Sequence, residues 1–323
     1  MDLDNRTPFP AMLFRSVVEE DMMVAAAIVR VTFEFGADGP VPSTSQPWKV
    51  RKEPIETPYG IKESDDLYYR EGTDVLLLGQ ARPEGAGPVG QLEVRVEIGG
   101  FACSTLVFGD RRWERGAPGE FKPSVPVPFT EIPLRADRAY GGKDTWDELE
   151  VASPENPEGK GFLLEEEHVE GRSLPNLEDP AQRITRWNEI VPPAGVGFCP
   201  ATSGLRLRNG LEIDEKGSIL AVKPALFNEA FPRMIAPRVE GGQRVRLTGM
   251  SVAGALDFVV PSLAFTCTVA FGSRLRGEVP FSIDQIGIEP DEGRFFLSFR
   301  APFRYKVHPH ETRTCMIVPT GMA

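Results

Sequence analysis

Alternation of apolar and polar residues at every second position is the feature that most constrains how this chain folds. Apolar side chains occupy positions 29, 31, 33 and 35, with Arg30, Thr32 and Glu34 between them. The same alternation runs through residues 92–98 and 244–248, and residues 295–300 are more uniformly apolar. Because successive side chains of a strand point to opposite faces, this period predicts β-strands.

Helical spacing is scarce, and its best example is residues 181–190. Asp179 and Pro180 precede that segment as a plausible cap and first-turn proline. The chain also holds 32 glycines and 30 prolines among 323 residues, a content that favours many turns between short strands. We therefore predict a mainly β fold with one helix at 181–190.

A faint internal repeat suggests how the strands are organised. Residues 90–111 and 254–274 share the order Gly, Leu, Phe, Cys, Phe-Gly and Arg, with the same spacing from Gly to Cys. If it is not a chance similarity, the repeat predicts two related β-sandwich-like halves. We assign residues 1–111 and 205–323 to these halves. Residues 112–204 form a loop-rich central segment between them, the whole making one compact unit.

Charge and composition restrict the classes of partner. The 47 acidic and 36 basic residues give a formal net charge of −11, which argues against a nucleic-acid partner. The acidic start of the chain does not resemble a signal peptide, and its longest apolar stretch is too short to cross a membrane. The four cysteines are widely spaced. We expect reduced thiols, no membrane insertion and a cytoplasmic location.

Signatures of catalysis are weak. The spacing G-x-G-x-x-G occurs at residues 85–90, but a strand pattern follows it where a dinucleotide-binding loop would require a helix. His308 and His310 could ligate a metal, but a single H-x-H is little support for a metal site. We therefore expect no cofactor, no metal and no enzymatic activity.

Arginines next to aromatic residues form a more distinctive pattern. Residues 110–113 read Asp-Arg-Arg-Trp, and residues 138–142 read Arg-Ala-Tyr-Gly-Gly. Arginine and aromatic side chains are enriched where proteins bind proteins. The alternative is an internal Asp–Arg pair, with the tryptophan covering the edge of the core. The sequence leaves both interpretations open.

Short motifs follow one another in a fixed order from about residue 65 to residue 200. They begin with Asp-Leu, Thr-Asp-Val and Gly-x-Ala, continue through Gly-Asp-Arg-x-Trp, and end in Leu-Pro-Asn and Pro-Ala-Gly. The residues that carry the motifs, and that we take as partner-binding or signature positions, are Asp66, Asp74, Asp110, Arg111, Trp113, Phe129, Pro133, Arg138, Tyr140, Gly141, Gly142, Asn156, Pro157, Phe162, Pro175 and Asn176.

In these motifs the chain resembles a domain-of-unknown-function family encoded beside type VI secretion spike (VgrG) and PAAR-tip genes. Three departures from the family pattern stand out. Arg70 replaces a lysine, the Trp-x-Pro-Arg segment expected after Phe198 is missing, and residues 227–232 match the family's F-x-x-A-x-P element only loosely. The resemblance implies a non-catalytic adaptor or chaperone that binds a secreted effector or PAAR protein and helps to load it onto VgrG.

Two other functions stay open at this stage. One is a carboxylate-dependent hydrolase that acts in the loop-rich central segment. The other is a carbohydrate-binding β-sandwich module, in which Trp113, Trp146 or Trp187 would form a flat stacking platform.

Overall fold

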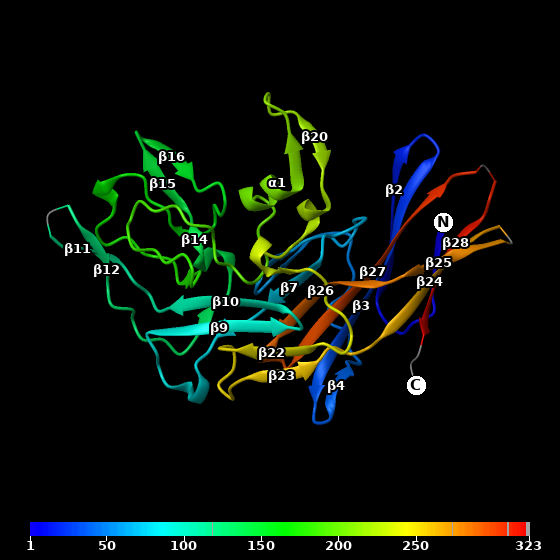
Figure 1. The fold of residues 1–323 in the computed structure, drawn as a ribbon, viewed down its shortest axis with the longest axis horizontal. Helices are drawn as coiled ribbons and strands as arrows, with labels where there is room; N and C mark the ends of the chain where they lie inside the picture. The colour runs from blue at the N-terminus through cyan, green and yellow to red at the C-terminus, as the bar shows by residue number, and fades with distance from the viewer. Residues whose placement is uncertain (118, 273, 309, 321–323) are drawn as a thin grey trace.

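A computed structural model describes residues 1–117, 119–272, 274–308 and 310–320. The fold is mainly β, as the alternation predicts. Figure 1 shows long strands crossing the middle of the molecule and a lobe of loops and short strands at one end. No helix among the described residues is long and apolar enough to cross a membrane.

The largest sheet has seven strands and draws on both ends of the chain. Its order is β2-β3-β27-β26-β7-β21, and β4 pairs with the end of β3. Pairing is antiparallel except between β26 and β7. The strands are β2 (Ala11–Glu19), β3 (Met22–Gly36), β4 (Gly39–Pro42), β7 (Thr73–Leu77), β21 (Ile235–Ala236), β26 (Ser282–Glu289) and β27 (Arg294–Lys306).

Two further sheets enclose the main core with it. One has the order β18-β10-β9-β22-β23 and the other β1-β28-β24-β25. Their strands are β9 (Gln91–Ile98), β10 (Phe101–Phe108), β18 (Leu177–Glu178), β22 (Arg244–Thr248), β23 (Leu256–Val259), β1 (Asp2–Asn5), β24 (Ala264–Phe271), β25 (Arg274–Pro280) and β28 (Arg313–Thr320). All four predicted strand segments lie within β3, β9, β22 and β27.

The remaining strands form two-stranded ladders. They are β5 (Ile55–Thr57), β6 (Gly60–Lys62), β8 (Gln80–Ala81), β11 (Trp113–Arg115), β12 (Phe121–Pro123), β13 (Ile132–Pro133), β14 (Tyr140–Gly141), β15 (Lys143–Trp146), β16 (Leu149–Ala152), β17 (Lys160–Gly161), β19 (Leu211–Ile213) and β20 (Ile219–Val222). Within the central segment, several of these ladders surround a second, smaller core that includes Trp113, Tyr140 and Phe162.

The helix predicted at residues 181–190 is absent, and that prediction is wrong. Side-chain carboxylates accept the backbone N–H groups that a helix would use. Glu189 accepts from the backbone of residues 185 and 186, and Glu178 accepts from that of residue 184. Among the described residues the only α-helix is α1 (Gly204–Gly210). The short 3₁₀ turns are η1 (Glu84–Ala86), η2 (Ala136–Arg138), η3 (Glu166–His168), η4 (Pro224–Phe227), η5 (Pro232–Met234) and η6 (Pro290–Glu292).

The division into two related halves is not confirmed. The first copy of the sequence repeat forms the β9–β10 hairpin within one sheet. In the second copy, β23 belongs to the five-stranded sheet and β24 to the four-stranded sheet. Moreover, β3 near the start of the chain pairs along its length with β27 near the end. Matching residues of the two repeat copies therefore lie in different sheets, because long-range pairing decides which sheet each strand joins.

Candidate functional site

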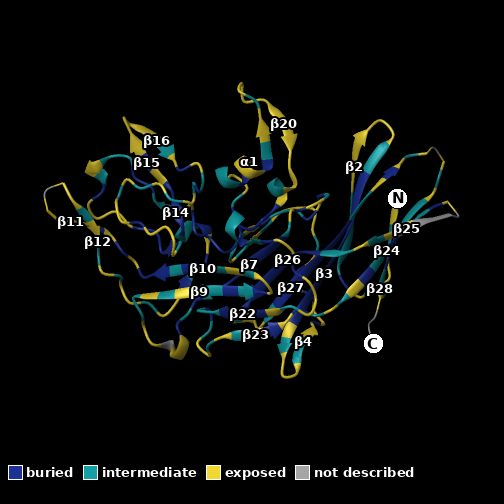
Figure 2. Ribbon diagram, in the orientation of Figure 1, coloured by how far each residue is buried: buried dark blue, intermediate teal, exposed yellow. Residues whose placement is uncertain are grey.

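Two of the three polar residues that alternate along β3, Arg30 and Thr32, are buried, and the third, Glu34, is exposed, although this alternation is typical of a strand with one face in water. Arg30 and Thr32 have no exposed surface, and Figure 2 shows the central strands β3, β26 and β27 coloured as buried. The side chain of Gln46 accepts from the backbone of Thr32 and donates to it. The segment that follows β4 therefore covers this face of the sheet.

Arg30 projects from that face into a group of buried charges. Its two terminal nitrogens lie 2.5 and 2.9 Å from the Asp65 carboxylate. Lys62 Nζ lies 3.0 Å from Asp65 and 2.8 Å from Glu229. Burial alone would raise the pKa of Asp65, but Arg30 and Lys62 outweigh it and hold that pKa well below its usual range.

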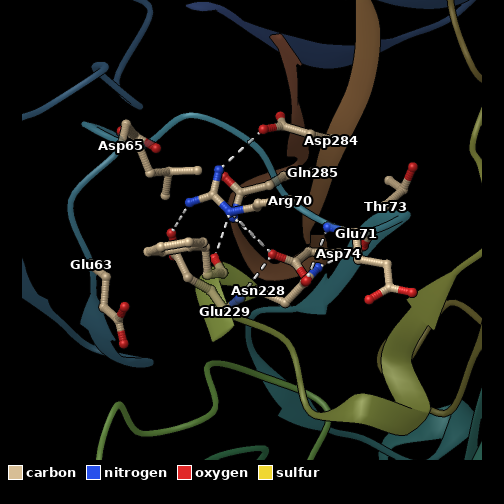
Figure 3. Close-up of polar contacts among 12 residues, drawn as sticks. Glu63, Asp65, Arg70, Glu71, Thr73, Asp74, Asn228, Glu229, Asp284 and Gln285 are labelled. Atoms are coloured by element: carbon tan, nitrogen blue, oxygen red, sulfur yellow. Dashed lines mark hydrogen bonds and ion pairs between the residues drawn. The ribbon is translucent and has the colours of Figure 1, made fainter. Parts of the chain in front are cut away.

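Arg70 continues the group toward β7 and β26 (Figure 3). It pairs with Glu229 and with Asp284, whose Oδ2 lies 3.1 Å away, and its Nε lies 3.6 Å from Asp74. Arg300 on β27 donates from Nε to the same Asp284 oxygen over 2.6 Å. We call the eight charged residues the ionic network: Arg30, Lys62, Asp65, Arg70, Asp74, Glu229, Asp284 and Arg300.

Asp74 on β7 and Asp284 on β26, both labelled in Figure 3, have pKa values that are shifted in opposite directions. Burial raises the pKa of Asp74, against the opposing charge of Arg70. For Asp284 the burial effect is outweighed by Arg300 and Arg70, so that its pKa is lowered. Removing one partner of such a buried pair leaves an uncompensated charge in the interior. The ionic network therefore fixes the segments that carry it against the sheet.

Arg206 on α1 anchors a further segment of the chain next to the ionic network. It pairs with Glu63 and donates to the backbone oxygens of Cys199 and Leu226. At the other end of this stretch, the side chain of Asn228 donates a 2.8 Å hydrogen bond to Asp74. Both ends of residues 206–229 are thus anchored to the interior.

Between these anchors the chain projects as the β19–β20 hairpin, at the top of the view in Figure 1. Its turn is closed by Asp214, which accepts hydrogen bonds from the backbone of Lys216 and Ser218. Gly217 supplies the positive φ of 81° that the turn needs. The two strands pair with each other and belong to no larger sheet.

One face of this hairpin is apolar and exposed. Leu211 pairs with Val222, and Ile213 pairs with Ile219, with a register shift between the two pairs. Cross-strand partners lie on the same face, and Leu211 and Ile213 are two positions apart, so these four side chains share a face. Ile213, Ile219 and Val222 are 59%, 61% and 53% exposed. Of the 18 large apolar side chains that are exposed in the described chain, six lie within residues 207–227. Such a concentration is typical of a surface that binds another protein.

Of the residues predicted from the arginine–aromatic pattern, Arg111 and Trp113 lie inside the protein. Arg111 pairs with Glu178 and stacks over Phe108, its guanidinium carbon 3.9 Å from the ring centre. Trp113 is 2% exposed and belongs to the second core. The geometry is that of an internal ion pair with a covered tryptophan, although the acid is Glu178 rather than Asp110.

Tyr140, Gly141 and Gly142 are also buried, and their glycines have a steric reason. Both adopt positive φ, 145° and 96°. A Cβ on Gly141 would lie 2.0 Å from the Asn156 carbonyl oxygen, and one on Gly142 would lie 2.5 Å from that of Gly159. The Asn156 side chain donates to the carbonyl oxygens of residues 136 and 140. This motif builds the lobe.

The structure brings three predicted residues together, the buried Asn176, the partly buried Arg138 and the exposed Asp110. Asn176 Nδ2 donates to Asp110 over 3.1 Å, and Arg138 Nη1 lies 3.4 Å from Asn176 Oδ1. The hydrogen bond from Asn176 lowers the pKa of Asp110. Lys160 Nζ, 3.6 Å from Asp110, completes the cluster.

The other predicted residues are dispersed. Asp66 is exposed, whereas Asp74 is part of the ionic network. Pro133 belongs to β13, and Phe129 packs against the main core. Of the rest, Phe162 and Pro175 are buried and Pro157 is partly buried.

Sequence reasoning missed the ionic network and the β19–β20 hairpin. Arg30 lies among the polar residues that alternate with the apolar face of its strand, and Glu229 and Asp284 lie far from it in sequence. The hairpin had one usable signal, the apolar residues on both sides of Asp214–Ser218. No group of three metal-ligating side chains occurs among the residues that the structure describes. Pro309, between the two histidines of the H-x-H pattern, lies outside those residues.

Comparison with known proteins identifies the family. A family model described as "Uncharacterized protein conserved in bacteria (DUF2169)" matches residues 20–300, and the chain belongs to this family. No curated protein and no solved structure matches the chain.

Proposed function

We propose that this DUF2169 family member is a non-catalytic adaptor or chaperone of type VI secretion. It binds an effector or PAAR protein in the cytoplasm of the producing cell and helps to load it onto the VgrG spike. The secretion context is what the family resemblance implies, carried by the sequence motifs between residues 65 and 200. The observation that carries a protein-binding role is the exposed apolar face of the β19–β20 hairpin.

The anchoring of the hairpin supports the same role. An apolar face that is held in place loses little conformational freedom when a partner covers it. Arg206 and Asn228 fix the two ends of the hairpin through buried contacts. The hairpin is thus a positioned binding element on a rigid β scaffold.

Co-expression with the neighbouring effector and PAAR genes, followed by affinity purification, tests the proposal. We expect the wild-type protein to capture one cognate client. The double variant Ile213→Asp/Ile219→Asp should reduce capture at least about tenfold, since charges replace the centre of an apolar contact. Glu212→Ala, on the opposite face of the same strand, should leave capture unchanged. Absence of any client from the wild-type preparation would contradict the adaptor role.

A hydrolase is the second candidate, supported by a cavity of about 140 Å³ that is lined by residues of the central segment and of the β5–β6 ladder. Its lining includes Glu63, Asp137 and Glu158. Glu63 pairs with Arg206, and Asp137 lies 3.3 Å from Arg135. Hydrolysis of a chromogenic ester or glycoside by the wild-type protein, abolished in Glu158→Gln, would favour this candidate.

The carbohydrate-binding alternative has less support. Trp113 is buried in the second core, and Trp187 is partly buried. Only Trp146 of the three tryptophans is extensively exposed, so the three do not form one exposed platform.

A further inference from the structure

Two cavities adjoin near the start of β26. The larger has a volume of about 360 Å³ and the smaller about 40 Å³. Arg238, Ser282 and Ile283 line both of them. The two cavities are therefore neighbours, and we refer to the larger as the wide end and to the smaller as the narrow end.

The wide end has an apolar wall beside polar groups. Val239, Phe265 and Phe299 in its lining are buried, and Phe281 is partly buried. This end has room for an apolar side chain. Glu240 also lines it, and its negative charge disfavours an acidic side chain there.

The narrow end is polar and ends at the ionic network. Arg70, Asp284 and Arg300 line it, and all three are at least nine-tenths buried. Arg300 uses Nε and Nη1 for Asp284 and for backbone oxygens, but its Nη2 has no hydrogen-bond acceptor among the described residues. Asp284 Oδ1 likewise lacks a donor within the described chain. Buried groups of this kind ordinarily have partners.

Arg238 supplies the unpaired charge at this end, and that positive charge favours an anion. The other two guanidinium groups in the lining, Arg70 and Arg300, are paired with Asp74, Glu229 and Asp284 of the ionic network. Arg238 is exposed at the mouth and forms no hydrogen bond or ion pair with the residues that the structure describes. A cavity of about 40 Å³ exceeds the roughly 10–15 Å³ that one water needs, and so admits a carboxylate group.

We propose that the paired cavities bind the C-terminal residue of a polypeptide whose last side chain is apolar. The α-carboxylate accepts from Arg300 Nη2 and Arg238, and the last backbone N–H donates to Asp284 Oδ1. The apolar side chain enters the wide end. This inference rests on the proposed function, because it names the part of the client that is recognised.

Fluorescence anisotropy with a labelled hexapeptide ending in Ser-Gly-Leu tests the inference. We expect binding of the free acid, with at least about a tenfold loss when the C-terminus is amidated or the last residue is aspartate. Arg238→Ala should weaken the free acid by a similar factor and leave the amide unchanged. The matched control is Arg246→Ala, an exposed arginine outside both cavities. Equal affinity for acid and amide, or no binding at millimolar peptide, would overturn the inference.

Decanoate as a competitor distinguishes a polypeptide from other apolar carboxylates. It carries a carboxylate on an apolar chain but has no N–H to donate to Asp284. Displacement of the labelled peptide by less decanoate than unlabelled peptide would overturn the assignment to a polypeptide; the reverse order supports it. If the peptide fails to bind while Glu212→Ala and wild type still capture a client, only this inference fails. Peptide binding without client capture would instead count against the proposed function.

Discussion

The ionic network and the β19–β20 hairpin depart from the usual distribution of side chains in opposite directions. The network encloses eight charged residues in the interior, whereas the hairpin holds three β-branched apolar side chains more than half exposed. The two regions are joined by one stretch of chain, which runs from Arg206 through the hairpin to Glu229. The charged side chains of the network make their contacts in the interior, whereas the apolar side chains of the hairpin are exposed and available to a partner.

This difference separates positioning from binding. A buried ion pair is weak evidence for stability in itself, because desolvation offsets much of the attraction. Its geometry is nevertheless demanding, since each charge must meet its partner. An exposed apolar face adds little to folding and becomes favourable when a partner covers it. Three substitutions and a change of pH test whether the two regions differ in this way.

Asp65→Asn should have the largest effect on stability. It removes the negative charge that lies between Arg30 and Lys62, leaving excess positive charge in the interior. We expect the free energy of unfolding to fall by about 3–5 kcal/mol, measured by urea denaturation. The adjacent exposed Asp66→Asn should change it by no more than about 0.5 kcal/mol. Equal losses in the two variants would show that burial of the network is not what matters.

Acid should weaken the network before it affects the hairpin. The pKa values of Asp65 and Asp284 are lower in the folded protein than the ordinary value of 3.8. Their contribution to stability is therefore present above about pH 4 and is lost as the pH falls toward their folded pKa values. The raised pKa of Asp74 acts in the opposite sense.

Urea midpoints measured between pH 5 and pH 3 check this dependence. We expect a steep fall for the wild type and a shallower one for Asp65→Asn, which lacks one of the two groups. An identical slope in both proteins would assign acid sensitivity to other carboxylates.

Arg206→Ala should have an intermediate effect, because Arg206 links the two regions. Its loss leaves the backbone oxygens of Cys199 and Leu226 without their donor, and we expect a cost of about 1–3 kcal/mol. The hairpin should also loosen, so that trypsin cleaves faster after Lys216 in its turn. Arg208→Ala is the control, since that arginine is mostly exposed. Unchanged cleavage would show that the hairpin does not depend on this anchor.

Ile219→Ser should have the smallest effect on folding. The side chain is 61% exposed, so we expect the free energy of unfolding to change by about 0.5 kcal/mol or less. Thermal denaturation measures this, with the buried Ile286→Ser as the contrasting variant. A loss of several kcal/mol for Ile219→Ser would mean that the apolar face already packs within the protein.

The strands could be predicted because their signal is local. Residues 92–98 alternate, and β9 covers them with Val94, Val96 and Ile98 facing the core. The predicted helix at 181–190 does not form, for an equally local reason that the spacing of apolar residues does not reveal. Its carboxylates bind the backbone directly, which competes with helical hydrogen bonds.

The candidate sites were harder to predict, because a side chain's burial depends on what is folded over it. Arg111 and Trp113 carry the signature of a binding surface, yet Glu178 and the second core enclose them. Conversely, the apolar residues of β19 and β20 have the pattern of core strands. Among the described residues these two strands join no larger sheet, and Ile213, Ile219 and Val222 remain exposed.

Local sequence patterns account for the mainly β class, the positions of the long strands and the motifs that mark the family. Each of these depends on residues that are neighbours along the chain. Three-dimensional folding is what brings Arg30 to Asp65 and Arg70 to Glu229 and Asp284, and what leaves the apolar face of the hairpin exposed. Such pairings join residues more than 150 positions apart in the cases of Arg70, and they form only when the sheet has brought its strands together and excluded water from between them.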